Sequence, residues 1–284
     1  MKVRFWGVRG SIPVPGAATQ RWGGNSSCVE VRHGEHVLVL DCGTGARALG
    51  QELFSHSGRE LDLLFTHFHM DHVFGFPFFG PVYAPGYQVR VTAPGFSEPE
   101  VRQKLARFVN GLYHPVRMRE IPCDLSFHPL MPGREVDRGI FKVQGIRLNH
   151  PGGSVGYRVR VGDTKVLYIT DTAPLAREGD GIMAGKESPS SERRLLKLME
   201  GADLVIFDTM FSYDEYLEKM TWGHAYPEYA YKLCTEAGVR HLVLFHHAPD
   251  ASDEALDALA EHWSQFTEPK VTLAQEGGEV DLEG

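Results

Sequence analysis

Three histidines and one aspartate lie within six positions of a short segment of the chain. His67, His69, Asp71 and His72 directly follow the apolar run 61–66. Neutral imidazoles and carboxylates are the usual ligands of zinc and related divalent ions. A regular helix or strand cannot point all four groups at one ion. We therefore predict a tight loop that divides these ligands between two metal ions.

Three further candidate ligands each follow a predicted strand. They are His150 after Phe141–Leu148, Asp171 after Val166–Ile169, and His246 after His241–Phe245. A single histidine after a strand is more often a hydrogen-bonded loop residue. Residues at the carboxyl ends of neighbouring strands can converge at one edge of a sheet, so the repeated pattern favours a metal site. We choose His246 because it is the first residue past its strand, and leave His247 as a neighbour that does not bind metal.

Asp208 and His224 form a second pair with the chemistry of proton transfer. Asp208 follows the predicted strand 203–207, and His224 precedes the predicted helix 226–237. A carboxylate beside an imidazole fixes its tautomer and favours its protonated form, so the ring can donate a proton. The alternative is that His224 caps its helix from a surface loop and Asp208 is an unrelated acid.

Alternating short strands and amphipathic helices predict a layered α/β sandwich, organised as a single domain over residues 1–284. The predicted strands are 2–6, 27–32, 36–41, 61–66, 88–92, 141–149, 155–161, 165–170, 203–207, 241–245 and 270–273. The predicted helices are 45–54, 98–109, 190–200, 226–237 and 252–266. The polar segment 174–191 is either a lid or an ordinary surface loop.

Two further features surround the predicted metal loop. Asp41 ends an early strand, where it is expected to accept the second N–H of a ligating imidazole. A cluster of phenylalanines follows the loop, at Phe74, Phe76, Phe78 and Phe79. We expect these rings mainly to form core beneath the metals, where they would limit access of solvent. Stacking of some rings on a base stays open.

Composition excludes several classes of protein. The 284 residues carry a net charge of −8, which argues against a broad nucleic-acid-binding face. No apolar run approaches the roughly 18 residues that cross a bilayer, so no membrane association is expected. Four scattered cysteines favour reduced, buried thiols and a cytoplasmic setting. The amino terminus is typical of a strand rather than a signal peptide.

The segment Thr66–His72 resembles the metal-binding signature of the metallo-β-lactamase superfamily. Other segments resemble its remaining motifs: 41–45, 149–158, 169–172 and 244–247. The resemblance implies a four-layer αββα sandwich. It also implies one ion held by His67, His69 and His150, a second held by Asp71, His72 and His246, and Asp171 shared between them. The two divalent ions would be zinc, with manganese or iron as alternatives.

Residues 202–211 and 221–225 resemble the ribonuclease Z-like phosphodiesterase branch of that superfamily. The resemblance implies that His224 is an extra active-site histidine oriented by Asp208, and that Asp71 also serves catalysis. It implies hydrolysis of a phosphodiester by a hydroxide that bridges the metals. The rivals are a thioesterase, lactonase or sulfatase on the same metals, a non-catalytic metal-binding protein of the same fold, and a di-iron redox protein.

The chain also departs from that branch. Ribonuclease Z carries a long tRNA-gripping arm, where this chain has only the hairpin Val161–Lys165. We therefore expect small phosphodiesters, cyclic nucleotides or short nucleic-acid ends as substrates, and we leave a homodimer open. Arg9 and Asn25 either approach the substrate or hold turns, and we favour the second role.

Overall fold

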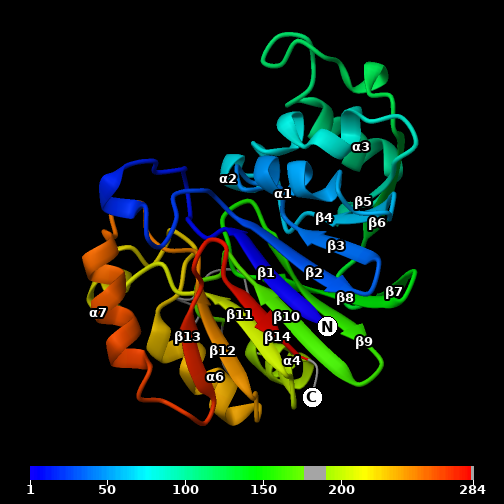
Figure 1. Ribbon diagram of the computed structural model, residues 1–284. Helices are drawn as coiled ribbons and strands as arrows, with labels where there is room; N and C mark the ends of the chain where they lie inside the picture. The colour runs from blue at the N-terminus through cyan, green and yellow to red at the C-terminus, as the bar shows by residue number, and fades with distance from the viewer. Residues whose placement is uncertain (176–189, 283–284) are drawn as a thin grey trace. The chain divides into compact units, whose positions relative to one another are not determined.

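A computed structural model describes residues 1–175 and 190–282 (Figure 1). The chain divides into two compact units. The first comprises Met1–Met131 together with the segment from Gln275 onward, and the second comprises Pro132–Ala274. Each unit is built on its own seven-stranded sheet. Within the described residues, every helix is too short or too polar to cross a membrane.

The sheet of the first unit has the order β14-β1-β2-β3-β4-β5-β6. Its strands are β1 (Lys2–Gly7), β2 (Cys28–His33), β3 (His36–Leu40), β4 (Glu60–Leu64), β5 (Gln88–Pro94), β6 (Asp124–Leu130) and β14 (Glu279–Asp281). Strands β3 to β6 run parallel, whereas β1, β2 and β3 form antiparallel pairs. The carboxyl ends of β3 and β4 therefore open on the same edge, one residue before Asp41 and two residues before Thr66.

The helices of the first unit lie over one face of β3–β6 (Figure 1). They are α1 (Ala46–Leu53), α2 (Met70–Val73) and α3 (Glu98–Ala106). The unit also contains the short 3-10 turns η1 (Ala17–Thr19), η2 (Phe76–Phe78), η3 (Gly80–Tyr83) and η4 (Met118–Glu120). Leu49 and Leu53 of α1 are buried with Val39 of β3 and Phe76 of η2 in one apolar core. This core supports the segment that carries the first group of candidate ligands.

The sheet of the second unit has the order β13-β12-β11-β10-β9-β8-β7. Its strands are β7 (Glu135–Arg138), β8 (Phe141–Leu148), β9 (Ser154–Val161), β10 (Thr164–Ile169), β11 (Leu204–Asp208), β12 (His241–Phe245) and β13 (Lys270–Leu273). Strands β10 to β13 are parallel. Because β9 is antiparallel to both β8 and β10, β8 shares their direction. Five strands, β8 and β10 to β13, therefore end at the same edge. Four of them, β8, β10, β11 and β12, carry a candidate residue at or just past their carboxyl ends.

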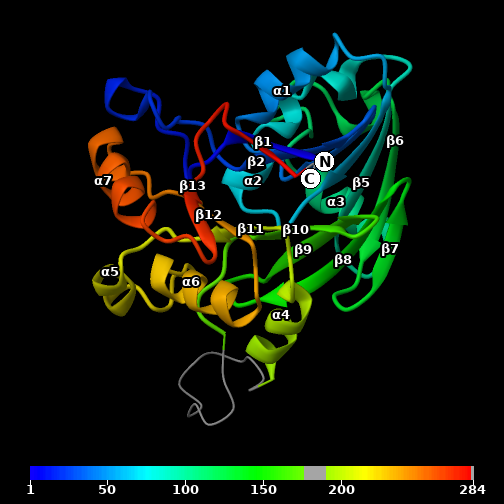
Figure 2. The same cartoon turned by 60° about the horizontal axis from the view of Figure 1, so that its bottom comes forward.

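The helices of the second unit are α4 (Ser191–Met199), α5 (Tyr213–Glu218), α6 (Pro227–Glu236) and α7 (Asp253–Trp263). Helix α4 packs beside α6, and α6 packs on β11 and β12 (Figure 2). Their apolar faces bury Leu195, Leu198, Leu233 and Cys234. This packing supports the central parallel strands, whose carboxyl ends carry the candidate residues.

All eleven predicted strands and all five predicted helices are present, with ends shifted by a few residues. The pattern missed the strands β6, β7 and β14 and the short helices α2 and α5. The missed strands lie at sheet edges, where no long apolar alternation is required. Helices of one turn or two carry too little periodicity to be recognised. Most of the predicted lid or loop 174–191 lies outside the described residues.

Two expectations around the ligand-rich segment are wrong in part. The segment is not wholly a loop, because Met70–Val73 forms α2 and carries Asp71 and His72. The phenylalanines after it are not all core. Phe76 and Phe79 are fully buried, but Phe74 is 39% and Phe78 is 62% exposed.

Candidate active-site residues

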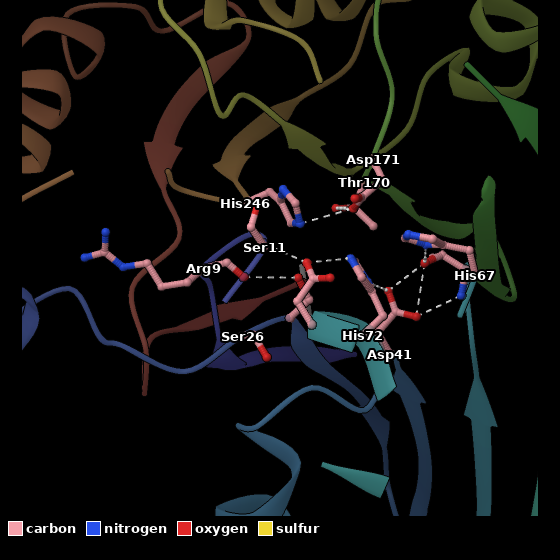
Figure 3. A network of polar contacts seen from close by, with 12 residues as sticks. Arg9, Ser11, Ser26, Asp41, His67, His72, Thr170, Asp171 and His246 are labelled. Carbon is pink, nitrogen blue, oxygen red and sulfur yellow. Dashed lines mark hydrogen bonds and ion pairs between the residues drawn. The ribbon is translucent and has the colours of Figure 1, made fainter. Parts of the chain in front are cut away.

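Asp41 organises the candidate ligands of the first unit. Its Oδ2 lies 2.7 Å from the Nδ1 of His72, and both side chains are fully buried (Figure 3). The backbone N–H of Thr66 donates to Asp41 Oδ1 over 2.8 Å, and the Thr66 hydroxyl donates to the same carboxylate. When Nδ1 of His72 donates to Asp41, its Nε2 carries the lone pair that can bind a metal. This arrangement agrees with the orienting role predicted for Asp41.

The other histidines of this segment lie close to His72. The ring centroids of His67 and His72 are 4.3 Å apart, and those of His67 and His69 are 4.4 Å apart. The Thr66 hydroxyl lies 3.0 Å from the Nδ1 of His67. Asp71 places one carboxylate oxygen 3.1 Å from the Nε2 of His72. The first unit therefore gathers all four of its predicted ligands at the ends of β3 and β4.

Close backbone packing positions helix α2. The N–H of Ser11, which has a φ of 62°, donates to Asp71 Oδ2 over 2.9 Å. A Cβ on Gly75 would lie 1.8 Å from the carbonyl oxygen of Gly43, and one on Gly43 would lie 2.3 Å from the carbonyl oxygen of Asp71. These positions leave no room for a side chain, so glycine there allows α2 to approach the turn after β3.

Asp171 lies between two histidines of the second unit. Its Oδ2 is 3.1 Å from the Nε2 of His246 (Figure 3). Its Oδ1 is 3.6 Å from the Nε2 of His150. The Thr170 hydroxyl donates to Oδ2 over 2.8 Å. Each carboxylate oxygen therefore faces a different imidazole, which is the geometry that a shared carboxylate needs.

Gly223 fixes the orientation of His150. The Nδ1 of His150 lies 2.9 Å from the Gly223 carbonyl oxygen, so Nδ1–H donates and Nε2 faces Asp171. Gly223 has a φ of 89°, and a Cβ there would lie 2.4 Å from His150 Nδ1. Both facts require glycine at the position before His224.

Asp208 and His224 form a buried pair. The Nδ1 of His224 lies 2.8 Å from Asp208 Oδ2. The backbone N–H groups of Thr172 and Met210 also donate to Asp208, each over 3.1 Å. The ring of His224 stacks on that of His246 at 5.1 Å. Asp208 therefore fixes the tautomer of His224 and leaves its Nε2 for other chemistry. Asp208, His224 and His246 are also close enough together to hold an ion themselves.

His247, Arg9 and Asn25, whose roles the sequence did not decide, each contact a neighbouring residue. The Nε2 of His247 lies 2.7 Å from the Ala274 carbonyl oxygen, whereas His246 faces Asp171. Buried Arg9 donates from Nε to the carbonyl oxygen of Gly23 over 2.8 Å. Asn25 donates from Nδ2 to Glu276 over 2.6 Å. Arg9 and Asn25 therefore tie loops together, as favoured from the sequence.

The cysteines do not add to the donor set. All four are free and buried. Burial raises the pKa of the Cys42 thiol well above its ordinary value, and neighbouring Asp41 raises it further. Both effects disfavour the thiolate form of Cys42, which is the form that binds metals.

Sequence reasoning included Thr66 and Gly223 in its motifs but predicted no orienting contact for Ser11, Thr66 or Gly223. Thr66 directly precedes His67 and Gly223 directly precedes His224, so their positions were a usable signal. Ser11 is distant from Asp71 in the chain, and only the folded turn shows its contact.

Comparison with known proteins identifies the family and the fold of the chain. A family described as "Beta-lactamase superfamily domain" matches residues 36–247, which is most of the chain. A ribonuclease Z of Archaeoglobus fulgidus is 26% identical, over 92% of this chain and 91% of its own length. That similarity therefore extends over nearly the full length of both proteins.

Two solved structures have the same fold. The metallo-β-lactamase fold protein YhfI of Bacillus subtilis has a TM-score of 0.69 at 19% identity and covers 98% of both chains. The short form of human tRNase Z has a TM-score of 0.69 at 20% identity and covers 100% of both chains. The predicted fold class is confirmed. The chain belongs to the metallo-β-lactamase superfamily and is a metal-dependent hydrolase similar to ribonuclease Z.

Proposed function

We propose that the chain hydrolyses phosphodiester bonds with two divalent metal ions. The observation that carries this proposal is the buried pair of His224 and Asp208, in which His224 also stacks on the candidate ligand His246. An imidazole with a fixed tautomer beside a metal ligand is suited to assist a departing oxygen. The curated relative named ribonuclease Z supports the same class of reaction.

The proposed ligands are the seven residues predicted from the sequence. His67, His69 and His150 would hold one ion, Asp71, His72 and His246 the other, and Asp171 would serve both. The family match over residues 36–247 includes all of these positions. Five imidazoles and two carboxylates form a donor set that suits zinc, and manganese or iron are alternatives. Asp41 and the Gly223 carbonyl orient two of the imidazoles for binding through Nε2.

Asp71, His224 and Asp208 would have different roles in the proposed hydrolysis. Bound divalent ions would supply an activated water and stabilise charge on the phosphoryl oxygens. Asp71 would help to place that water, since its carboxylate is fixed by the N–H of Ser11. His224 would donate a proton to the leaving oxygen from Nε2, while Asp208 holds its Nδ1–H.

The substrate proposal is a small phosphodiester, a cyclic nucleotide or a short nucleic-acid end. The net charge of −8 disfavours a broad surface for folded RNA. Strands β9 and β10, where the sequence resemblance places the tRNA-gripping arm, are joined by Gly162 and Asp163 alone. We also propose that the protein acts in the cytoplasm and can form a homodimer.

A substrate panel tests this function. Protein reconstituted with zinc or manganese would be assayed on bis(p-nitrophenyl) phosphate, a dinucleotide, a thioester and a lactone. We expect turnover of both diesters that a chelator abolishes and that added metal restores. Preferred turnover of the thioester or lactone, with neither diester cleaved, would contradict the proposal.

A further inference from the structure

A cavity of about 680 Å³ lies wholly within the first unit, beside α2. Its walls include Met70, Phe74, Phe78 and Tyr113. These side chains are unusually accessible for apolar residues, with exposed fractions of 60%, 39%, 62% and 82%. Large apolar side chains grouped around a concavity, rather than scattered singly, indicate a binding site.

The aromatic rings are held by contacts within the unit. The ring of His114 meets that of Phe78 edge to face, with centroids 5.5 Å apart, and that of Tyr83 at 6.0 Å. Phe78 lies at the end of the short turn η2, between the buried rings of Phe76 and Phe79. The buried side chains of Phe76 and Phe79 thus hold the backbone at Phe78 in place, while most of the Phe78 side chain is exposed.

Two cations border the apolar walls. Arg47 and Arg107 both line the cavity and are exposed. Throughout residues 1–175 and 190–282, neither guanidinium has a carboxylate partner. A guanidinium binds phosphate oxygens through paired N–H groups. The cavity therefore combines surfaces for a flat apolar ring with two donors for an anion.

We propose that this cavity binds the nucleobase beside the scissile phosphate, with Arg47 and Arg107 on a phosphate of the same nucleotide. The inference rests on the proposed phosphodiesterase function and specifies a nucleotide as its substrate. Met70, in the cavity wall, stands between the candidate ligands His69 and Asp71. A nucleotide seated here would therefore meet the same helix that carries the proposed metal ligands.

The affinities of phosphate compounds that the protein binds without cleaving a diester, measured by calorimetry, test the proposal. The probes are adenosine 5′-monophosphate, ribose 5-phosphate and hexyl phosphate, added to metal-reconstituted protein. Base stacking should make adenosine 5′-monophosphate bind roughly tenfold or more tightly than ribose 5-phosphate. Phe78→Ala and Tyr113→Ala should each remove most of that advantage and leave ribose 5-phosphate binding unchanged. Arg107→Gln should weaken both ligands.

Phe96→Ala is the matched control, because Phe96 is 82% exposed on the same unit and outside the cavity. It should leave all three affinities unchanged. Equal binding of adenosine 5′-monophosphate and ribose 5-phosphate to the wild type would overturn the base site. Hexyl phosphate binding as tightly as adenosine 5′-monophosphate would identify an alkyl site instead. Because no turnover is measured, failure of diester hydrolysis would be seen separately, in the substrate panel.

Discussion

The Nε2 of His246 lies 3.1 Å from Asp171 Oδ2, and both residues adopt left-handed backbone, with φ of 64° and 56°. Asp41 shares this conformation, with a φ of 58°. Each left-handed residue that is not glycine costs on the order of 1–3 kcal/mol, and such strain concentrates at functional sites. All three lie at or just past a strand end. The backbone thus supports independently the residues selected for their chemistry.

Gly223→Ala should reduce metal affinity by displacing His150. The added Cβ would lie 2.4 Å from the His150 ring, and loss of an orienting contact typically weakens metal binding roughly 10–100-fold. Zinc affinity measured by chelator competition checks this. Gly162→Ala is the control, since Gly162 has a φ of 58° with nothing within 4 Å of its Cβ position. Equal effects of the two substitutions would show that backbone strain alone is responsible.

Asp41→Asn should weaken metal binding by roughly 10–100-fold, because it removes the carboxylate that orients His72. The same chelator competition measures the effect. Asp62→Asn is a matched control: Asp62 is also a buried acid of this sheet, but it pairs with Arg90. It should lower the free energy of unfolding and leave metal affinity unchanged. A loss of affinity in both variants would assign Asp41 a general structural role.

His224→Ala should affect poor leaving groups most. General acid assistance contributes roughly 10²–10⁴ in rate, so kcat/KM on a dinucleotide should fall by about that factor. A nitrophenyl diester, which has a good leaving group, should lose distinctly less. Asp208→Ala should show the same pattern more mildly, with metal content unchanged in both variants. Equal losses on the two diesters would point to substrate positioning or metal support rather than proton transfer.

His241, which is not one of the candidate site residues, should make the free energy of unfolding depend on pH. Burial, with a smaller effect of Lys270, lowers its pKa from 6.5 to about 4. The neutral ring contacts the Thr272 hydroxyl at 2.7 Å. Its contribution to stability is therefore complete above pH 6.5 and is lost as pH falls toward 4.

Urea denaturation of wild type and His241→Asn at pH 7 and pH 4.5 measures this contribution. The wild type should lose about 2 kcal/mol more than the variant over that interval. Parallel stability curves for the two proteins would show that His241 does not titrate as its burial requires.

Much of the fold followed from pattern, because the central strands are continuous apolar runs and the longer helices are amphipathic. The candidate residues followed from their position after those strands, as at Asp171 and His246. The contacts that orient these residues could not be predicted from the sequence. The Gly223 carbonyl and the Ser11 N–H are backbone groups, which every residue type but proline also has, so residue type does not reveal them. The exposure of Phe78 could not be predicted from the sequence either, because a cluster of phenylalanines is typical of a buried core. Only the structure shows the cavity that Phe78 lines.

Metal content tests the central claim most directly, namely that the seven ligand residues hold two ions for phosphodiester cleavage. Elemental analysis of reconstituted wild-type protein should give about two divalent ions per chain, the number a two-metal hydrolase needs. Asp171→Ala should lose both ions and the hydrolysis of diesters, because its two oxygens face different imidazoles. A wild-type ratio that never exceeds one, in protein that hydrolyses diesters fully, would contradict the account.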